Sequence, residues 1–107
     1  MQVTEIYALQ TATMIGCALE GTAEWFIELH TNHATEASAL TTMVAELNAA
    51  RDKDLALMQS EYPQDQYCED DYAIRLHTVK GNSSFHELVR RNGTEMIPLT
   101  QMVITKT

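Results

Sequence analysis

Hydrophobic residues recur at helical spacing through the middle of the chain. Between Thr35 and Glu61 the steps along one side are three or four residues long, as on one face of a helix. This stripe comprises Ala37, Leu40, Val44, Leu47, Arg51, Leu55, Met58 and Tyr62. Asn32 or Thr35 can cap the start, and Pro63 ends the pattern. The sequence therefore predicts one long helix over residues 35–61.

Alternating apolar and polar residues predict a strand on each side of this helix. Before the helix, Trp25, Ile27 and Leu29 alternate with more polar neighbours, and after it the alternating set is Tyr72, Ile74 and Leu76. If both strands lay parallel in one sheet, the connection between them would be a right-handed crossover.

The N-terminal segment has two interpretations. Residues 11–19 are rich in Thr, Ile and Met, and Gly21 can turn this segment into an antiparallel hairpin with the Trp25 strand. Ile6, Leu9 and Thr13 also keep helical spacing, so a helix over residues 3–15 is the alternative.

The C-terminal third is also open to two interpretations. Ser84 followed by Glu87 is a capping box, which favours a short helix over residues 84–92. Asn92-Gly93 is a strong hairpin signal, which would instead make residues 85–91 a strand. We slightly favour the helix. Residues 96–104 then return as an extended segment, with Pro98 at an edge or a bulge.

These elements predict a single α+β domain spanning residues 1–107. We expect a small mixed or antiparallel sheet packed on one long helix. The expected order is β-β-α-β, followed by a short helix or strand and then by a final strand. A chain of 107 residues can bury a core without disulfides or metal. An exposed edge strand would allow a homodimer.

Charge is distributed unevenly along the chain, whose net charge is −8. Residues 1–50 contain acidic side chains and no Lys or Arg, whereas basic residues predominate after residue 74. This distribution argues against direct nucleic-acid binding, which needs a basic surface. No apolar run is long enough for a membrane span, and the N-terminus lacks the features of a signal peptide. We expect a cytoplasmic protein with Cys17 and Cys68 as free thiols.

Motifs for catalysis, metal or cofactors are missing from the sequence. There is no nucleophile elbow, phosphate loop, dinucleotide fingerprint or zinc-protease motif. His30 and His33 are close in sequence, but neither cysteine has a second ligand nearby, so we expect no metal site and no cofactor. Acidic neighbours of Cys68 disfavour its thiolate, so we assign no catalytic residue. One enzymatic alternative remains: Glu28, His30, Arg75 and His77 would share a polar sheet face if their strands were neighbours.

The densest chemical feature is the segment 61–72, which combines carboxylates with tyrosines and has no basic residue. Tyrosines supply contact area and carboxylates pair with Arg or Lys, so this segment is typical of a recognition loop. The expected partner-binding residues, which include two acids of the Trp25 strand, are Asp65, Tyr67, Glu69, Asp70, Asp71, Tyr72, Glu24 and Glu28.

The function that fits these features is that of a non-enzymatic, acidic interaction protein. We expect it to bind and block a basic, nucleic-acid-handling protein partner, such as a nucleic-acid-binding complex. In size and charge the chain resembles accessory proteins of phages and mobile elements, including anti-CRISPR inhibitors, which would place it in the host cytoplasm. The alternatives are a structural or assembly subunit, and a small enzyme or ligand-binding domain that uses the sheet face near His30 and His77.

Overall fold

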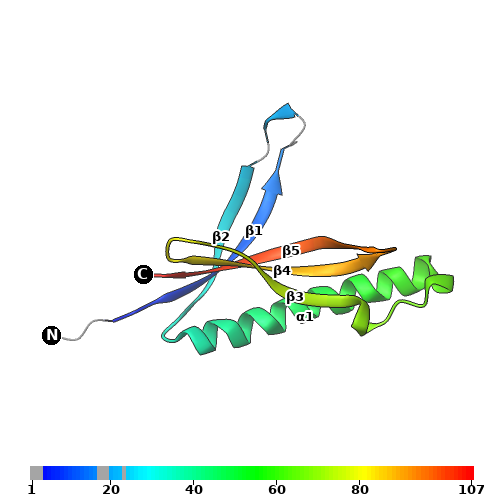
Figure 1. Ribbon diagram of the computed structural model, residues 1–107. Helices are drawn as coiled ribbons and strands as arrows, with labels where there is room; N and C mark the ends of the chain where they lie inside the picture. Colours follow the sequence, from blue (N-terminus) through cyan, green and yellow to red (C-terminus); the bar gives the residue numbers. More distant parts are fainter. Residues whose placement is uncertain (1–3, 17–19, 23) are drawn as a thin grey trace.

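The computed structural model describes residues 4–16, 20–22 and 24–107, which form a five-stranded sheet and one long helix (Figure 1). Two short 3₁₀ helices, η2 and η3, connect the long helix to the third strand. In chain order the elements are β1 (Tyr7–Ile15), β2 (Glu24–His33), α1 (Glu36–Glu61), η2 (Pro63–Asp65), η3 (Glu69–Asp71), β3 (Tyr72–Lys80), β4 (Ser83–Asn92) and β5 (Glu95–Lys106).

The strands lie in the order β2-β1-β5-β4-β3, and every neighbouring pair is antiparallel. The expected α+β class is therefore confirmed. β2 and β3 lie at opposite edges of the sheet and, after four antiparallel steps, run in the same direction, so α1 connects two parallel strands of one sheet by a crossover. β1 fits between β2 and β5, so the first and last strands of the chain are direct neighbours.

Helix α1 begins and ends close to the expected positions. The Thr35 hydroxyl accepts a hydrogen bond from the Ser38 N–H at 3.1 Å, so Thr35 is the N-cap. Tyr62, before Pro63, is the C-terminal cap. The buried face shares Leu47 and Met58 with the expected stripe, but its other buried residues are Ala39 and Met43, so the face is rotated from the expected one. Both stripes are apolar at helical spacing, so periodicity alone could not choose between them.

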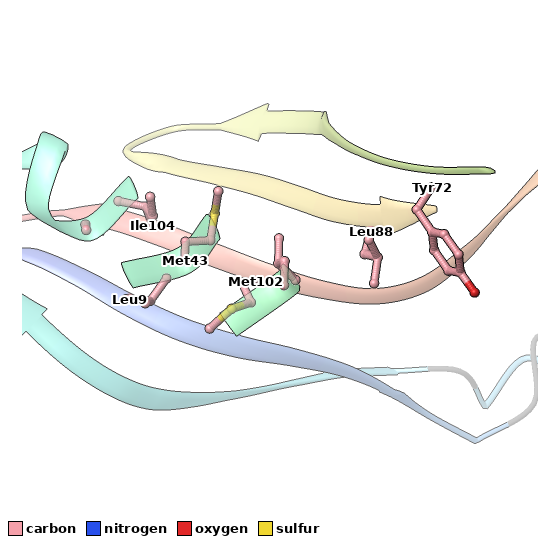
Figure 2. Close-up of a cluster of buried hydrophobic side chains, with 8 residues drawn as sticks. Leu9, Met43, Tyr72, Leu88, Met102 and Ile104 are labelled. Carbon is pink, nitrogen blue, oxygen red and sulfur yellow. The ribbon is translucent and has the colours of Figure 1, made fainter. Parts of the chain in front are cut away.

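The core lies between α1 and one face of the sheet (Figure 2). Figure 2 shows side chains from β1, α1, β3, β4 and β5 in one buried row, namely Leu9, Met43, Tyr72, Leu88, Met102 and Ile104. Burial of such side chains contributes about 1.5–3 kcal/mol each, so this layer is the main source of stability. Expected core positions Val44 and Leu76 are instead exposed.

Residues 83–92 form strand β4, so the slightly favoured short helix over residues 84–92 is wrong. Asn92 pairs with Glu95, and Gly93 adopts a φ of 65° at the first central position of the turn. A glycine there is typical of a type II′ hairpin. The N-terminal alternative is settled in the same way: residues 7–15 are a strand, and the helix over 3–15 is not formed.

Pro98 lies at a bulge, which was one of its two expected settings. The β4–β5 register shifts between Leu88 and Val89, since Leu88 pairs with Thr100 and Val89 with Pro98. A proline cannot donate a ladder hydrogen bond. An internal strand therefore tolerates a proline at a bulge, where the regular ladder is interrupted. The bulge lets β5 occupy the middle of the sheet.

Candidate interaction surface

The hairpin of β1 and β2 carries a group of exposed large apolar side chains. In Figure 1 its outer half extends away from both α1 and the other three strands. On β2, the consecutive side chains Trp25, Phe26 and Ile27, together with Leu29, are 40–59% exposed. Met14 and Ile15 of β1 are exposed beside them. An exposed group of large apolar side chains of this size is typical of an interaction site.

Both faces of the hairpin carry apolar side chains. Trp25 pairs with Met14 and Ile27 with Ala12, whereas Phe26 pairs with Thr13 on the opposite face. The alternation suggested that Trp25, Ile27 and Leu29 would face the core. The strand is confirmed, but the core placement of its apolar residues is wrong, because Trp25 lies with Glu87 and Gln101 on the sheet face opposite α1.

Two acids accompany this apolar surface, which we call the hairpin surface. Glu24 and Glu28 are exposed on β2, and within the described residues neither has an ion-pair partner. Their charges are therefore available to a basic partner. Like the loop acids Asp65 and Asp70, which are also expected partner-binding residues, these two are exposed as the expectation required.

The expected recognition loop has a different structure. Tyr67 and Tyr72 are buried, so the expectation that they offer contact area at the surface is corrected. The Arg91 guanidinium lies over the Tyr67 ring at 4.8 Å, and the Arg90 guanidinium lies 5.6 Å from the ring centre. Cation–π contacts of this kind hold the ring against the sheet.

Tyr72 is fixed by an interaction with the helix. Its hydroxyl donates a hydrogen bond to Asp54 Oδ2 at 2.6 Å, and the Arg90 Nε–H donates to the same oxygen at 2.9 Å. Burial, together with the neighbouring carboxylate, raises the pKa of Tyr72 well above its usual value. Sequence patterns could not reveal this connection, because Asp54 and Arg90 are far apart along the chain.

The loop acids divide into paired and free groups. Asp71 Oδ1 accepts a hydrogen bond from Arg91 Nε at 2.7 Å, and Glu69 lies 3.6 Å from Arg51. Asp65 and Asp70 are exposed, and the described residues provide no ion pair for either. Glu69 and Asp71, two of the expected partner-binding residues, are thus already paired with arginines of the same chain.

The pKa of Asp71 is lowered, first because Arg91 hydrogen-bonds to it and then because the Cys68 N–H donates to its other oxygen. The Cys68–Asp71 contact closes the single turn of η3. Asp71 is therefore a structural residue. Reversing its charge would disturb the fold as well as any interface.

The sheet face opposite α1 carries a polar cluster that sequence reasoning missed. Glu87 of β4 is only 2% exposed, although its face is not covered by the helix. Its Oε1 accepts a hydrogen bond from Arg75 Nε at 2.7 Å, and its Oε2 accepts one from Gln101 Nε2 at 3.1 Å. His77 Nδ1 lies 3.6 Å from Oε2.

A cleft of about 530 Å³ opens above this cluster, between Trp25 and Met14 of the hairpin and Pro98 of β5. Gln101 Oε1 is buried beside it, and no described residue donates a hydrogen bond to that oxygen. The Glu87 charge is already balanced by Arg75, and Gln101 Oε1 is covered by neighbouring atoms. These polar groups therefore act first as internal support for the sheet.

The sheet-face grouping considered for an enzyme is not assembled. His77 lies beside Glu87, whereas His30 lies 3.6 Å from Glu46 of α1, on the face that the helix covers. The two histidines belong to β3 and β2, the opposite edges of the sheet. Arg75 and His77 do meet an acid, but that acid is Glu87 and not Glu28.

Metal and thiol chemistry receive no support from the described geometry. Nowhere in the described ranges do three His, Cys, Asp or Glu side chains gather closely enough to hold a metal ion. Cys68 is an exposed free thiol, and Cys17 lies outside the described residues. Among the described helices, none has both the length and the apolar character needed to cross a membrane.

Comparisons with known proteins do not place the chain in a family: no family model, curated protein or solved structure matches it. Its function must therefore be inferred from its own surfaces. A signal for the hairpin surface did exist in the sequence. Four large apolar residues occur within five positions at Trp25–Leu29, and only one side of a strand can face a single core.

Proposed function

We propose that this protein is a non-enzymatic interaction protein that binds and blocks a basic, nucleic-acid-handling protein in the cytoplasm. This activity would be like that of phage or mobile-element inhibitors such as anti-CRISPR proteins. The observation that carries the proposal is the hairpin surface, where exposed Trp25, Phe26, Ile27 and Leu29 lie beside Glu24 and Glu28, two acids with no ion pair to any described residue. The proposed contact thus moves from the loop over residues 65–72 to the hairpin.

The apolar part of this surface would provide most of the affinity. Interfaces are usually dominated by a few aromatic anchors that become fully desolvated, and Trp25 and Phe26 are of that type. Removing apolar surface from water contributes about 25 cal/mol per Å² before the entropic cost of association. A partner with an apolar strip between basic residues would fit both features.

The acidic part would select the partner and speed association. Glu24 and Glu28 project from a chain with net charge −8, so the long-range field attracts basic surfaces and repels nucleic acids. Electrostatic steering weakens as salt screens it, over a Debye length of about 8 Å at physiological ionic strength. A nucleic-acid-binding protein presents such a basic surface.

The test compares two double variants in a quantitative pull-down from the native host. The hairpin variant Phe26→Ser/Glu28→Lys removes one aromatic and reverses one acid on the hairpin surface. The control variant Val79→Ser/Glu61→Lys makes equivalent changes at exposed positions elsewhere. We expect a basic protein to be captured by the wild type and the control, and its capture by the hairpin variant to fall at least about tenfold, which is 1.4 kcal/mol.

The captured protein is then purified and tested directly. We expect its binding to this chain to weaken with salt, and its binding to nucleic acid to be lost when the complex forms. Equal capture by both variants would place the interface elsewhere. A partner that still binds nucleic acid normally within the complex would contradict the proposed blocking activity.

A further inference from the structure

Strand β2 is a long edge strand with few features that would prevent another strand from pairing with it. It has ten residues, and among the described strands only β1 pairs with it. Its outward backbone N–H and C=O groups are therefore free to pair with another strand. Natural edge strands are commonly protected by Lys, Pro or a covering element, and Glu24–His33 contains neither Lys nor Pro.

The charges of β2 restrict how it could pair with a second copy of itself. When two identical strands pair antiparallel, the two-fold axis passes midway between the two copies of one central residue. The register is named below by that residue. An axis at Phe26 would place Glu24 opposite Glu28 of the second copy, and an axis at Glu28 would place two copies of Glu28 together. Like charges directly opposite one another are destabilising.

An axis at Ile27 avoids both like-charge pairs and places Phe26 opposite Glu28 of the second copy. It places Glu24 opposite His30 of the second copy, so that a carboxylate meets a residue that can donate a hydrogen bond, in competition with Glu46 of its own chain, which lies 3.6 Å away. On the other face, Trp25 lies opposite Leu29 of the second copy, and the two copies of Ile27 lie opposite each other. Aromatic–aliphatic and aliphatic pairs of this kind stabilise sheets.

Regular pairing would extend over residues 24–30 and end at a natural boundary. On the β1 side, Gln10 pairs with Leu29 and Leu9 with Thr31, so His30 is the extra residue of a bulge. Bulges interrupt regular pairing and often occur at sheet edges. Uniform alternation therefore covers residues 24–29, and the Glu24–His30 pair lies at its boundary.

We propose that two copies of this chain pair through β2, antiparallel and centred on Ile27, to form a continuous ten-stranded sheet. This homodimer uses the backbone edge of β2 and leaves both faces of the hairpin open. It does not rest on the proposed inhibitor function. The two hairpins together would form a four-stranded apolar ribbon, which doubles the hairpin surface.

The first measurement is the molar mass of the purified wild-type chain, by light scattering at physiological salt. Salt is needed because each copy carries a net charge of −8, and this repulsion is screened only at sufficient ionic strength. We expect twice the 12.0 kDa mass of one chain at micromolar concentration. A monomer at all concentrations up to about 1 mM would overturn the proposal.

The second measurement tests the register through charge. Glu24→Lys places a cation opposite His30 of the second copy, and His30→Glu places two acids together, so each variant alone should dissociate at least tenfold more readily. Mixing the two variants should restore a heterodimer, in which Lys at position 24 meets Glu at position 30. Recovery on mixing shows that both variants are folded, whereas no recovery would overturn this register.

The third measurement traps the central pair. In a Cys17→Ser/Cys68→Ser background, Ile27→Cys should form an intermolecular disulfide under mild oxidation, because opposed residues lie within disulfide distance. Leu29→Cys in the same background is the control, since it lies opposite Trp25 and not opposite its own copy. Equal cross-linking of both variants would contradict pairing centred on Ile27.

Discussion

Asp71 holds the segment between α1 and β3 through both of its carboxylate oxygens. One oxygen accepts from Arg91 and the other from the Cys68 N–H. Its side chain is largely buried, whereas its neighbour Asp70 is exposed. Two adjacent acids of identical chemistry thus have different roles, and only their tertiary surroundings distinguish them.

We predict that Asp71→Asn lowers the melting temperature at pH 7 and lowers it less near pH 3. The pKa of Asp71 is lowered in the folded protein, so its stabilisation is present above the unfolded pKa of about 4. The stabilisation is lost as the pH falls through the lower, folded-state pKa. Asp70→Asn is the matched control and should change neither value. Equal losses for Asp71→Asn at both pH values would show that its charge is unimportant.

For single residues, the sequence predicted the exposure of the acids on β2 correctly, but it did not predict the burial of the tyrosines near β3. Glu24 and Glu28 are exposed as expected, since acids on an edge strand are rarely buried. Tyr67 and Tyr72 were assigned to the surface because they occur among acids. Their burial depends on Arg90 and Arg91 of β4, whose position only the folded sheet defines.

Helix α1 shows what periodicity can and cannot determine. Its ends are marked by local signals, Thr35 and Pro63, and were predicted closely. Its buried face depends on which of two apolar stripes fits the sheet. Leu47 belongs to the expected stripe and is 1% exposed, whereas Val44 of that stripe is 40% exposed.

We predict that Leu47→Ala lowers the free energy of unfolding by about 2–5 kcal/mol, as truncation of a buried leucine does. Val44→Ala, a smaller truncation at an exposed position of the same helix, should change it by no more than about 0.5 kcal/mol. Urea unfolding of both variants measures the difference. Similar losses for the two variants would mean that the helix is rotated relative to the buried face described above.

Strand β4 was the most difficult element to predict. Its Ser84 and Glu87 form a capping pattern, yet Glu87 instead pairs with Arg75 across the β3–β4 hairpin. Competition from cross-strand partners on both sides overrides the local helix signal. The same limit applies to the hairpin surface, because the exposure of Trp25 depends on which face of the folded sheet α1 covers, and Trp25 lies with Glu87 and Gln101 on the other face.

At the scale of the whole molecule, the fold can be explained without a bound ion. The core between α1 and the sheet is continuous, and no metal-binding group of side chains occurs among the described residues. We predict that melting curves with and without EDTA coincide to within about 1 °C. A chelator-induced drop of several degrees, reversed by added zinc, would reveal a stabilising metal.

The position of β1 between β2 and β5 has a consequence for folding during synthesis. The Thr107 N–H donates a hydrogen bond to the Ile6 carbonyl at 2.9 Å, so residues about one hundred positions apart close the sheet. Contacts between such distant positions form slowly. While the ribosome is still making the chain, β1 and β2 can pair, but their inner edge has no neighbour until β5 emerges. The apolar hairpin is then open on both edges, and a chaperone that shields it would matter most at this stage.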